Sequence, residues 1–319
     1  MTQRETNPYP FSDSNKRYRT FESYARLAFG KRVVKLPLDG GFTCPNIDGH
    51  CGTGGCIYCS ARGGGEFAPD ASLPIAEQIA RQKALYARKW DPSACIAYFQ
   101  ARTNTYAPLP VLREKFEEAL RQPGIVGLSI ATRADCLPPD VVEYLAELAD
   151  RTSLTVELGL QSASDETAAR IRRGHTWADF LDGYRRLRAA SGRIALCVHL
   201  IFGLPGEDDE QMLESVRRVA DLRPEQVKLH LLHVLRGTDL EELWQTGAYQ
   251  PLERERYLRL VADALELLPP ETVIGRVTGD GARDELLAPL WSLRKREILN
   301  ALDQLMYREN RWQGKRWQK

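Results

Sequence analysis

"VVKLPLDGGFTCPNIDGHCGTGGCIYCS" (residues 33–60) joins a short apolar run to a glycine-rich loop with four cysteines. The apolar, β-branched start is typical of a strand buried on both faces of a parallel sheet. Functional groups in α/β folds gather at the carboxyl ends of the strands, so we expect this loop to lie on the functional face. Its cysteines are Cys44, Cys51, Cys56 and Cys59.

Similar apolar runs recur along the chain and alternate with amphipathic helical patterns. One helical pattern follows Pro138 and Pro139, with Val142, Leu145 and Leu148 at helical spacing. Alternation of strand and helix, repeated about six times, predicts a parallel α/β barrel or an open doubly wound sheet. The six predicted strands are 33–38, 95–100, 124–131, 154–160, 193–203 and 227–234.

The composition excludes several classes of protein. Among 319 residues, 44 are Lys or Arg and 43 are Asp or Glu, so the net charge of +1 predicts no partner. No apolar run approaches the roughly 20 residues of a membrane helix, and the polar N-terminus has no signal-peptide core. Seven cysteines are too few, and odd in number, for a disulfide scaffold. We therefore expect a cytoplasmic protein, with no membrane partner, whose clustered cysteines bind metal or serve catalysis.

The cysteine loop, residues 44–59, suits two kinds of metal site. Cys56 and Cys59 form a C-x-x-C pair, and Cys44 lies upstream with eleven residues between. Four thiolates would complete a closed zinc site, for which His50 offers a substitute ligand, although zinc ribbons usually pair two separated C-x-x-C turns. Three thiolates would instead bind three irons of a [4Fe–4S] cluster and leave the fourth iron open. The loop alone leaves both alternatives open.

Both ends of the chain are basic. The segment YRENRWQGKRWQK (307–319) holds five basic residues, one acidic residue and two tryptophans, and the strand and helix pattern degenerates after Trp291. Basic residues interleaved with aromatic ones fit phosphate neutralisation combined with base stacking, although most charge runs are merely solvated. The basic residues before the first strand include Lys16, Arg17, Arg19, Arg26, Lys31 and Arg32.

Six motifs stand at or near predicted strand ends: C-x11-C-x2-C (44–59), AYFQARTNTYA (97–107), ATRADCL (131–137), VELGLQSASDETAARIRRGHT (156–176), HLIFGLPGE (199–207) and KLHLLHVLRGT (228–238). Together they resemble radical S-adenosylmethionine (SAM) enzymes, over roughly residues 17–295. The resemblance is closest to the bacterial YhcC-like family, near the Elongator catalytic subunit and the oxygen-independent coproporphyrinogen oxidases. It implies a partial (β/α)6 TIM-like barrel (31–290) between a basic N-terminal extension (1–30) and a basic, aromatic C-terminal tail (291–319). It also makes the zinc alternative much weaker.

The resemblance implies roles for individual residues. Cys44, Cys56 and Cys59 would bind a [4Fe–4S] cluster, whose open iron chelates the amino and carboxylate groups of SAM. Tyr58 would bring its backbone near the adenine. Glu157 could bind ribose hydroxyls or equally be a buried structural acid. The other predicted cofactor contacts are Gln100, where many relatives have a Gly-Gly-Glu-like element, Gln161 at the ribose, Arg173 at the methionine carboxylate, and His199, Ile201 and His233 near the nucleoside.

Two features fall outside this pattern. A Gly-Gly-Gly-Glu run at 63–66 is similar to the amine-binding element of relatives, but it lies in the loop after the cluster cysteines, so we interpret it as a chance match to that element. Cys51 is a fourth cysteine beside the three-cysteine pattern, and we expect it to be a bystander.

The activity implied by the resemblance is reductive cleavage of SAM to methionine and a 5′-deoxyadenosyl radical, which abstracts hydrogen from the substrate. A reductant such as flavodoxin or ferredoxin would supply the electron. The basic ends and the Elongator resemblance favour a tRNA wobble uridine as substrate, with a small metabolite as the alternative. A non-enzymatic, zinc-stabilised RNA-binding protein is the alternative of another class. Predicted substrate contacts are Arg102, Arg133, Lys228, His230 and Arg276.

Overall fold

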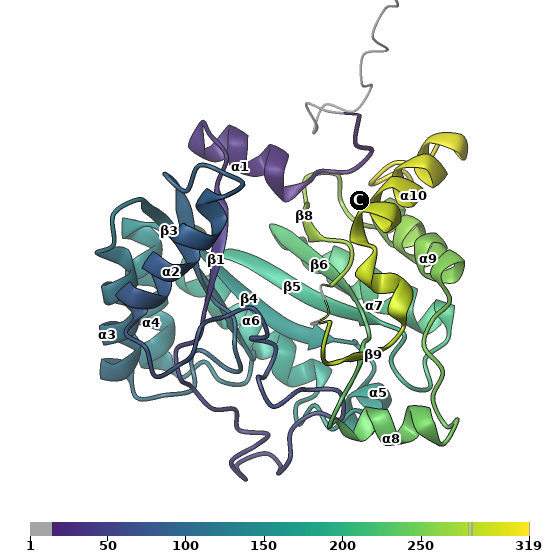
Figure 1. Cartoon of the computed structure of the whole chain (residues 1–319), viewed down its shortest axis with the longest axis horizontal. Helices are drawn as coiled ribbons and strands as arrows, with labels where there is room; N and C mark the ends of the chain where they lie inside the picture. Colours follow the sequence, from purple (N-terminus) through teal and green to yellow (C-terminus); the bar gives the residue numbers. More distant parts are fainter. Residues whose placement is uncertain (1–14, 280, 282, 319) are drawn as a thin grey trace, which may run out of the picture.

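The computed structural model describes residues 15–279, 281 and 283–318, in which seven strands form one parallel sheet (Figure 1). The strand order β1-β2-β3-β4-β5-β6-β8 follows the chain. Six of these strands were predicted from the sequence, and β8 is a seventh that pairs with β6. The bounds are β1 (Val34–Leu38), β2 (Cys95–Phe99), β3 (Ile125–Thr132), β4 (Ser153–Gln161), β5 (Ala195–Phe202), β6 (Gln226–Leu231) and β8 (Val273–Arg276), with a short antiparallel pair of β7 (Val234–Leu235) and β9 (Leu286–Ala288).

Helices connect the strands and cover the outer face of the sheet (Figure 1), as parallel strands require. They are α1 (Phe21–Phe29), α2 (Ile75–Ala87), α3 (Leu109–Leu120), α4 (Pro139–Arg151), α5 (Asp165–Arg170), α6 (Trp177–Ala190), α7 (Asp209–Leu222), α8 (Asp239–Gln245), α9 (Arg254–Leu267), the 3-10 helix η1 (Leu290–Leu293) and α10 (Lys295–Arg308). None of the helices in the described part of the chain has both the length and the apolar character that a membrane crossing needs.

The apolar strand residues form the core between sheet and helices. Leu36 on β1, Val156 and Leu158 on β4 and Leu196 on β5 are completely buried in one large cluster. Burial of a side chain of this size contributes about 1.5–3 kcal/mol. The near-continuous apolar runs of the sequence are therefore explained by strands that pack helices on one face and line the barrel interior on the other.

The sheet curls into a partial barrel, and one buried carboxylate shows how far. Four strands separate β1 from β6, which in a flat sheet would place them roughly 24 Å apart, at about 4.8 Å per strand. Yet Lys35 of β1 and Lys228 of β6 both contact the carboxylate of Glu157 on β4. The interior is thus closed enough for distant strands to meet at one side chain, which confirms the predicted partial barrel.

The two ends of the described chain pack together beside β8. Thr20 pairs with Ile274 of β8, and the main-chain N–H of Arg19 donates to the side-chain oxygen of Gln313 at 2.8 Å. The amide of Gln313 donates in turn to the carbonyl of Pro269 at 2.6 Å. From this edge, α1 crosses towards β1 at the top of Figure 1. The N-terminal segment therefore links the two edges of the open barrel.

The segment after Trp291 is more regular than its sequence pattern indicated. It contains α10, on which Ile298, Leu302 and Met306 are buried at successive i, i+4 positions. These three side chains belong to the main core cluster. The apolar residues at i, i+4 spacing were the signal for a helix here, but the charged residues between them make the pattern difficult to recognise.

Candidate active site

A cavity of about 250 Å³ lies at the carboxyl ends of the strands and brings most of the predicted site residues together. We call it the inner cavity. It is lined by all three predicted ligand cysteines and by ten further predicted residues. These are Tyr58, Gln100, Arg102, Arg133, Glu157, Gln161, Arg173, His199, His230 and Arg276.

Three predicted residues do not line the inner cavity. Ile201 packs against a second, smaller hydrophobic cluster. The ring of His233 lies beside Gly279, beyond the end of β6. Lys228 faces a neighbouring cavity instead, although its ammonium group reaches Glu157. Contacts of Ile201 and His233 with a nucleoside stay predictions.

The cysteine loop is folded by its own backbone hydrogen bonds. The carbonyl of Cys44 accepts from the N–H of Ile47 at 2.8 Å, and the carbonyl of Cys56 accepts from the N–H of Cys59 at 3.0 Å. Gly55 has a φ of +79°, a conformation that L residues with side chains rarely adopt, and its N–H donates to the carbonyl of Asn46 at 2.8 Å. These turns hold the three cysteines on one side of the loop, towards the inner cavity.

The spacing of the sulfur atoms distinguishes between the two metal alternatives. Ligands of one tetrahedral zinc lie about 3.8 Å apart, given Zn–S bonds of about 2.3 Å. Among the described residues, only Glu157, Cys197 and His199 form a group of three or more whose possible ligand atoms all lie within 4.8 Å of one another. The sulfur atoms of Cys44, Cys56 and Cys59 do not form such a group, so they are spread more widely than the ligands of one zinc ion. Cys51 is exposed and lines a different cavity. Three separated thiols around one cavity fit a cluster, in which each binds a different iron, better than a single ion.

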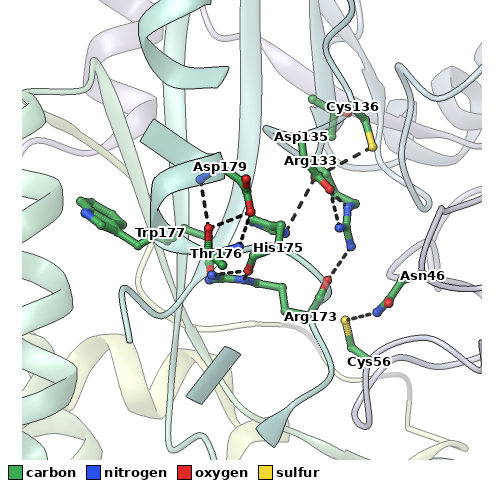
Figure 2. A network of polar contacts seen from close by, with 12 residues as sticks. Asn46, Cys56, Arg133, Asp135, Cys136, Arg173, His175, Thr176, Trp177 and Asp179 are labelled. Atoms are coloured by element: carbon green, nitrogen blue, oxygen red, sulfur yellow. Dashed lines mark hydrogen bonds and ion pairs between the residues drawn. The ribbon is translucent and has the colours of Figure 1, made fainter. Parts of the chain in front are cut away.

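Burial keeps the thiols of the C-x-x-C pair protonated in the absence of a metal. Burial is the main cause of the raised pKa of Cys56. Burial, together with the neighbouring Cys56, raises the pKa of Cys59 to about 12. Only a strong local positive charge stabilises thiolates in such a place, and bound metal supplies it. Metal binding would therefore displace a proton from each of these two thiols. The side-chain amide of Asn46 already donates to the sulfur of Cys56 at 3.5 Å (Figure 2).

Two non-glycine residues that line the inner cavity have left-handed backbones. Gln161 has a φ of +62° and Arg102 a φ of +57°. The strand pairing shifts in register at Gln161, where β4 ends beside β5. Such conformations cost about 1–3 kcal/mol each and cluster at functional sites, where the fold imposes them. At Gln161 the cause is visible, because the register shift re-aims the last residue of β4 towards the cavity.

Arg173 is deeply buried and largely committed to the backbone (Figure 2). Its guanidinium donates to the carbonyls of Leu160, Ser162 and His175, using four of its five N–H groups. Its own carbonyl accepts from Arg133 at 2.6 Å. Arg173 therefore holds the turn after β4, and one N–H remains for the predicted contact with the SAM carboxylate.

Arg133 and His175 form the adjoining part of this network (Figure 2). Arg133 pairs through two nitrogens with the carboxylate of Asp135, at 2.7 and 3.0 Å. This bidentate pair neutralises Arg133 in part and fixes its direction. Burial, followed by repulsion from Arg173, lowers the pKa of His175 to about 3. His175 lines the cavity as a neutral ring, and neither of its nitrogens has a hydrogen-bond partner.

Glu157 is the centre of a polar network that reaches all six predicted strands, here called the Glu157 network. Glu157 accepts from Lys35 at 2.8 Å, from Ser129 at 2.5 Å and from His199 at 2.7 Å. Lys228 also donates to it, and donates to the hydroxyl of Tyr98 at 3.1 Å. Burial opposes ionisation, but the two lysines and His199 hold the pKa of Glu157 well below its usual range. The same oxygens are engaged by ammonium groups, so this cluster is an ion-pair network and no metal site.

Acidification should destabilise the protein through His199. Burial, followed by repulsion from Lys228, lowers the pKa of His199 to about 4, whereas an unfolded histidine titrates near about 6.5. Between these values only the unfolded chain binds the proton, so stability falls as the pH falls through this window. We expect His199 to remove about 2 kcal/mol of the free energy of unfolding between pH 7 and pH 5.

Urea unfolding at both pH values measures this change. The variant His199→Gln lacks the titrating ring and should lose less stability over the same interval. An equal loss in both proteins would show that His199 is not the group responsible.

Several site residues were missed by sequence reasoning. Lys35 and Tyr98 stand inside apolar runs that were interpreted only as strands, yet a lysine in such a run was a signal of a polar interior. The 63–66 run lies closer to the site than its place in the sequence indicated. Gly63 and Gly64 line the inner cavity, and their carbonyls accept from the backbone of Arg102 and from the side chain of Gln100.

Two family models match most of the chain. The one described as the Radical SAM superfamily matches residues 47–219, and the one described as the Radical_SAM C-terminal domain matches residues 224–308. YtqA of Bacillus subtilis is 45% identical over 315 residues, 99% of this chain and 97% of that protein. YhcC of Escherichia coli K12 is 39% identical over 290 residues, 90% of this chain and 86% of that protein.

More distant similarities cover part of the relative. A tRNA uridine(34) acetyltransferase of Methanocaldococcus jannaschii is 28% identical over 158 residues, 49% of this chain and 28% of that protein. Among solved structures, archaeal Elp3 of Methanocaldococcus infernus superposes with a TM-score of 0.67 over 88% of this chain and 64% of that chain, at 16% identity. At this identity the structural similarity concerns the fold alone.

Proposed function

Because the chain belongs to the radical SAM superfamily, whose members use a [4Fe–4S] cluster and SAM, we propose that it is a radical SAM enzyme with Cys44, Cys56 and Cys59 as the cluster ligands. The observation that supports this most is the convergence of these three cysteines on one cavity at the carboxyl end of the barrel. The same cavity is lined by six of the eight residues predicted to contact SAM. Cys51 is exposed outside it.

The cofactors, when bound, supply an electron and a cleavable sulfonium, from which a 5′-deoxyadenosyl radical arises. The residues of the chain bind, orient and shield them. Gln161, held in a left-handed backbone at the end of β4, is suited to a fixed hydrogen bond with a ribose. The remaining N–H of Arg173 is suited to a carboxylate. Tyr58 is half-buried beside the second hydrophobic cluster and limits access of water.

In this proposal the buried histidines do not transfer protons. His199 and His230 both line the cavity, and burial is the first cause that lowers the pKa of each. Both rings are therefore neutral near pH 7 and serve as hydrogen-bonding groups. Glu157 is ionised near pH 7, because its pKa is held well below its usual range.

We propose a wobble uridine of tRNA as the substrate. Support comes from the half-chain similarity to an enzyme whose name gives tRNA uridine(34) as its target. The basic ends support it less than their sequences indicated. Arg311 is buried and paired with Asp263 and Glu266, and Lys16 is paired with Asp303. An external one-electron donor of the flavodoxin or ferredoxin class completes the proposal.

Reconstitution under anaerobic conditions tests this function. With SAM and dithionite, the cluster-loaded protein should release 5′-deoxyadenosine, and tRNA from a strain lacking the gene should increase the rate while tRNA from the parent strain does not. Digestion of the tRNA and mass spectrometry of its nucleosides should show one uridine derivative converted. Release of 5′-deoxyadenosine without any change in tRNA would instead favour the small-metabolite substrate. A colourless protein with one bound zinc would overturn the enzyme assignment.

A further inference from the structure

A second cavity of about 570 Å³ adjoins the inner cavity, and we call it the outer cavity. Tyr98, Gln100 and Arg276 line both cavities. Lys35 and Lys228 line the outer one, whereas Glu157 lines the inner one. The Glu157 network is therefore a partition, with its carboxylate on the cofactor side and its two ammonium groups on the other.

The partition carries more positive than negative charge. Lys35 and Lys228 share the single carboxylate of Glu157. No Asp or Glu is found among the described residues that line the outer cavity. The side chain of Lys228 is only 5% exposed. A buried cation in excess of the neighbouring anions costs stability, so its presence points to a role in function.

Each ammonium group also keeps one hydrogen-bond donor. Lys35 donates to Glu157 and, at 3.3 Å, to the hydroxyl of Ser129. Lys228 donates to Glu157 and to Tyr98. Since an ammonium group has three N–H donors, one remains on each lysine. These donors, from opposite strands of the barrel, can converge on one oxyanion.

Aromatic side chains form another part of the wall. Phe21, Phe67 and Tyr86 line the outer cavity together with Tyr98. Phe67 is 48% exposed and Leu85, which lines the same cavity, is 58% exposed, so the wall includes exposed apolar surface of the kind found at binding sites. Aromatic faces of this kind stack on flat rings with little preference among them.

We propose that the outer cavity is the substrate-recognition site and that Lys35 and Lys228 bind an oxyanion of the substrate, a carboxylate or a phosphate, that adjoins a flat ring. This inference rests on the proposed function only in that it assigns the ligand of this cavity as the substrate. It gives the two lysines a role in substrate binding, separate from the cluster and from SAM.

Three related probes test the proposal on the full-length, cluster-loaded protein. Uridine offers a ring without an anion, orotate a ring with a carboxylate, and uridine 5′-monophosphate a ring with a phosphate. Calorimetric titration should show that one anionic probe binds at least about tenfold more tightly than uridine, since a charge-assisted hydrogen bond is worth about a factor of ten or more. Orotate identifies a carboxylate as the recognised group, and the nucleotide identifies a phosphate.

The variants Lys35→Gln and Lys228→Gln should each lose about tenfold to a hundredfold in binding of that probe. Lys35→Arg, which keeps the charge, should retain most of it, and Lys89→Gln removes an exposed lysine as the matched control. Near-UV circular dichroism reports whether each variant folds. If Lys228→Gln does not fold, the comparison of Lys35→Gln with Lys35→Arg carries the test.

Substrate-free cleavage of SAM by dithionite separates this proposal from the proposed function. The parent protein and the exposed-lysine control Lys89→Gln should release 5′-deoxyadenosine at the same rate, which shows that the preparation used for the probes is active. Equal binding of all three probes, or unchanged anion binding in both lysine-to-glutamine variants, would overturn the anion site while leaving the enzyme assignment intact. Failure of the parent protein to cleave SAM would overturn the enzyme assignment, whatever the probes show.

Discussion

Substitution of Cys59 by alanine is expected to abolish both cluster binding and SAM cleavage. Cys59 is one of three thiols that line the inner cavity, and Cys51 is exposed outside it and lines a different cavity. Changes beyond the direct ligands already cost about 10–100-fold in metal affinity or activity, so loss of a ligand should cost more. We expect 5′-deoxyadenosine release to fall by more than about 100-fold, along with the iron and sulfide content and the visible absorption of the reconstituted protein.

Cys51→Ala is the matched control, because it removes a thiol from the same loop. It should bind the same amount of iron as the parent protein and cleave SAM at a similar rate. The assignment of the ligands would be wrong if Cys51→Ala lost the cluster, or if Cys59→Ala kept it.

Replacement of Glu157 by glutamine should cause a large loss of stability. The amide cannot neutralise Lys35 and Lys228, which both lie against it, and two buried ammonium groups then lack a counter-ion. Removing one partner of a buried ion pair costs about 3–5 kcal/mol. Urea unfolding at pH 7 should show a decrease of this size, and the unfolding midpoint should fall accordingly.

A matched control and a compensating change make this test specific. Glu77→Gln breaks an exposed pair with Arg81 on α2 and should change stability by less than about 0.5 kcal/mol. The double variant Glu157→Gln/Lys228→Met removes one of the uncompensated charges, so it should be more stable than Glu157→Gln alone. Strictly additive losses in the double variant would show that the two residues do not interact.

The local pattern of the sequence predicted a large part of this fold. Apolar runs such as 33–38 predicted strands correctly, because a strand buried on both faces needs an apolar side chain at almost every position. The position of Cys44 after the first run placed the cysteine loop at the carboxyl edge, which the structure confirms. These inferences depend on neighbours in sequence, and so they could be made without the structure.

Contacts between distant segments could not be read in this way. The meeting of Lys35 with Lys228 at one carboxylate depends on how far the sheet curls, which no local pattern encodes. Arg173 looked like a free ligand for a carboxylate, but its N–H groups are mostly used by carbonyls that only the folded turn brings near. The helix α10 was missed because its three buried residues stand among charged ones.

The tie between Arg19 and Gln313 has a consequence for biosynthesis. The two residues are 294 positions apart, and the N-terminal segment pairs with β8, which is itself among the last strands made. Domains generally fold during translation from the N-terminus onward, but contacts of such long range form late. A nascent chain whose residue 313 has not yet left the ribosome can pair its N-terminal segment with β8 but cannot form the contact between Arg19 and Gln313. The two ends of the described chain are therefore joined fully only when almost all of it has been made.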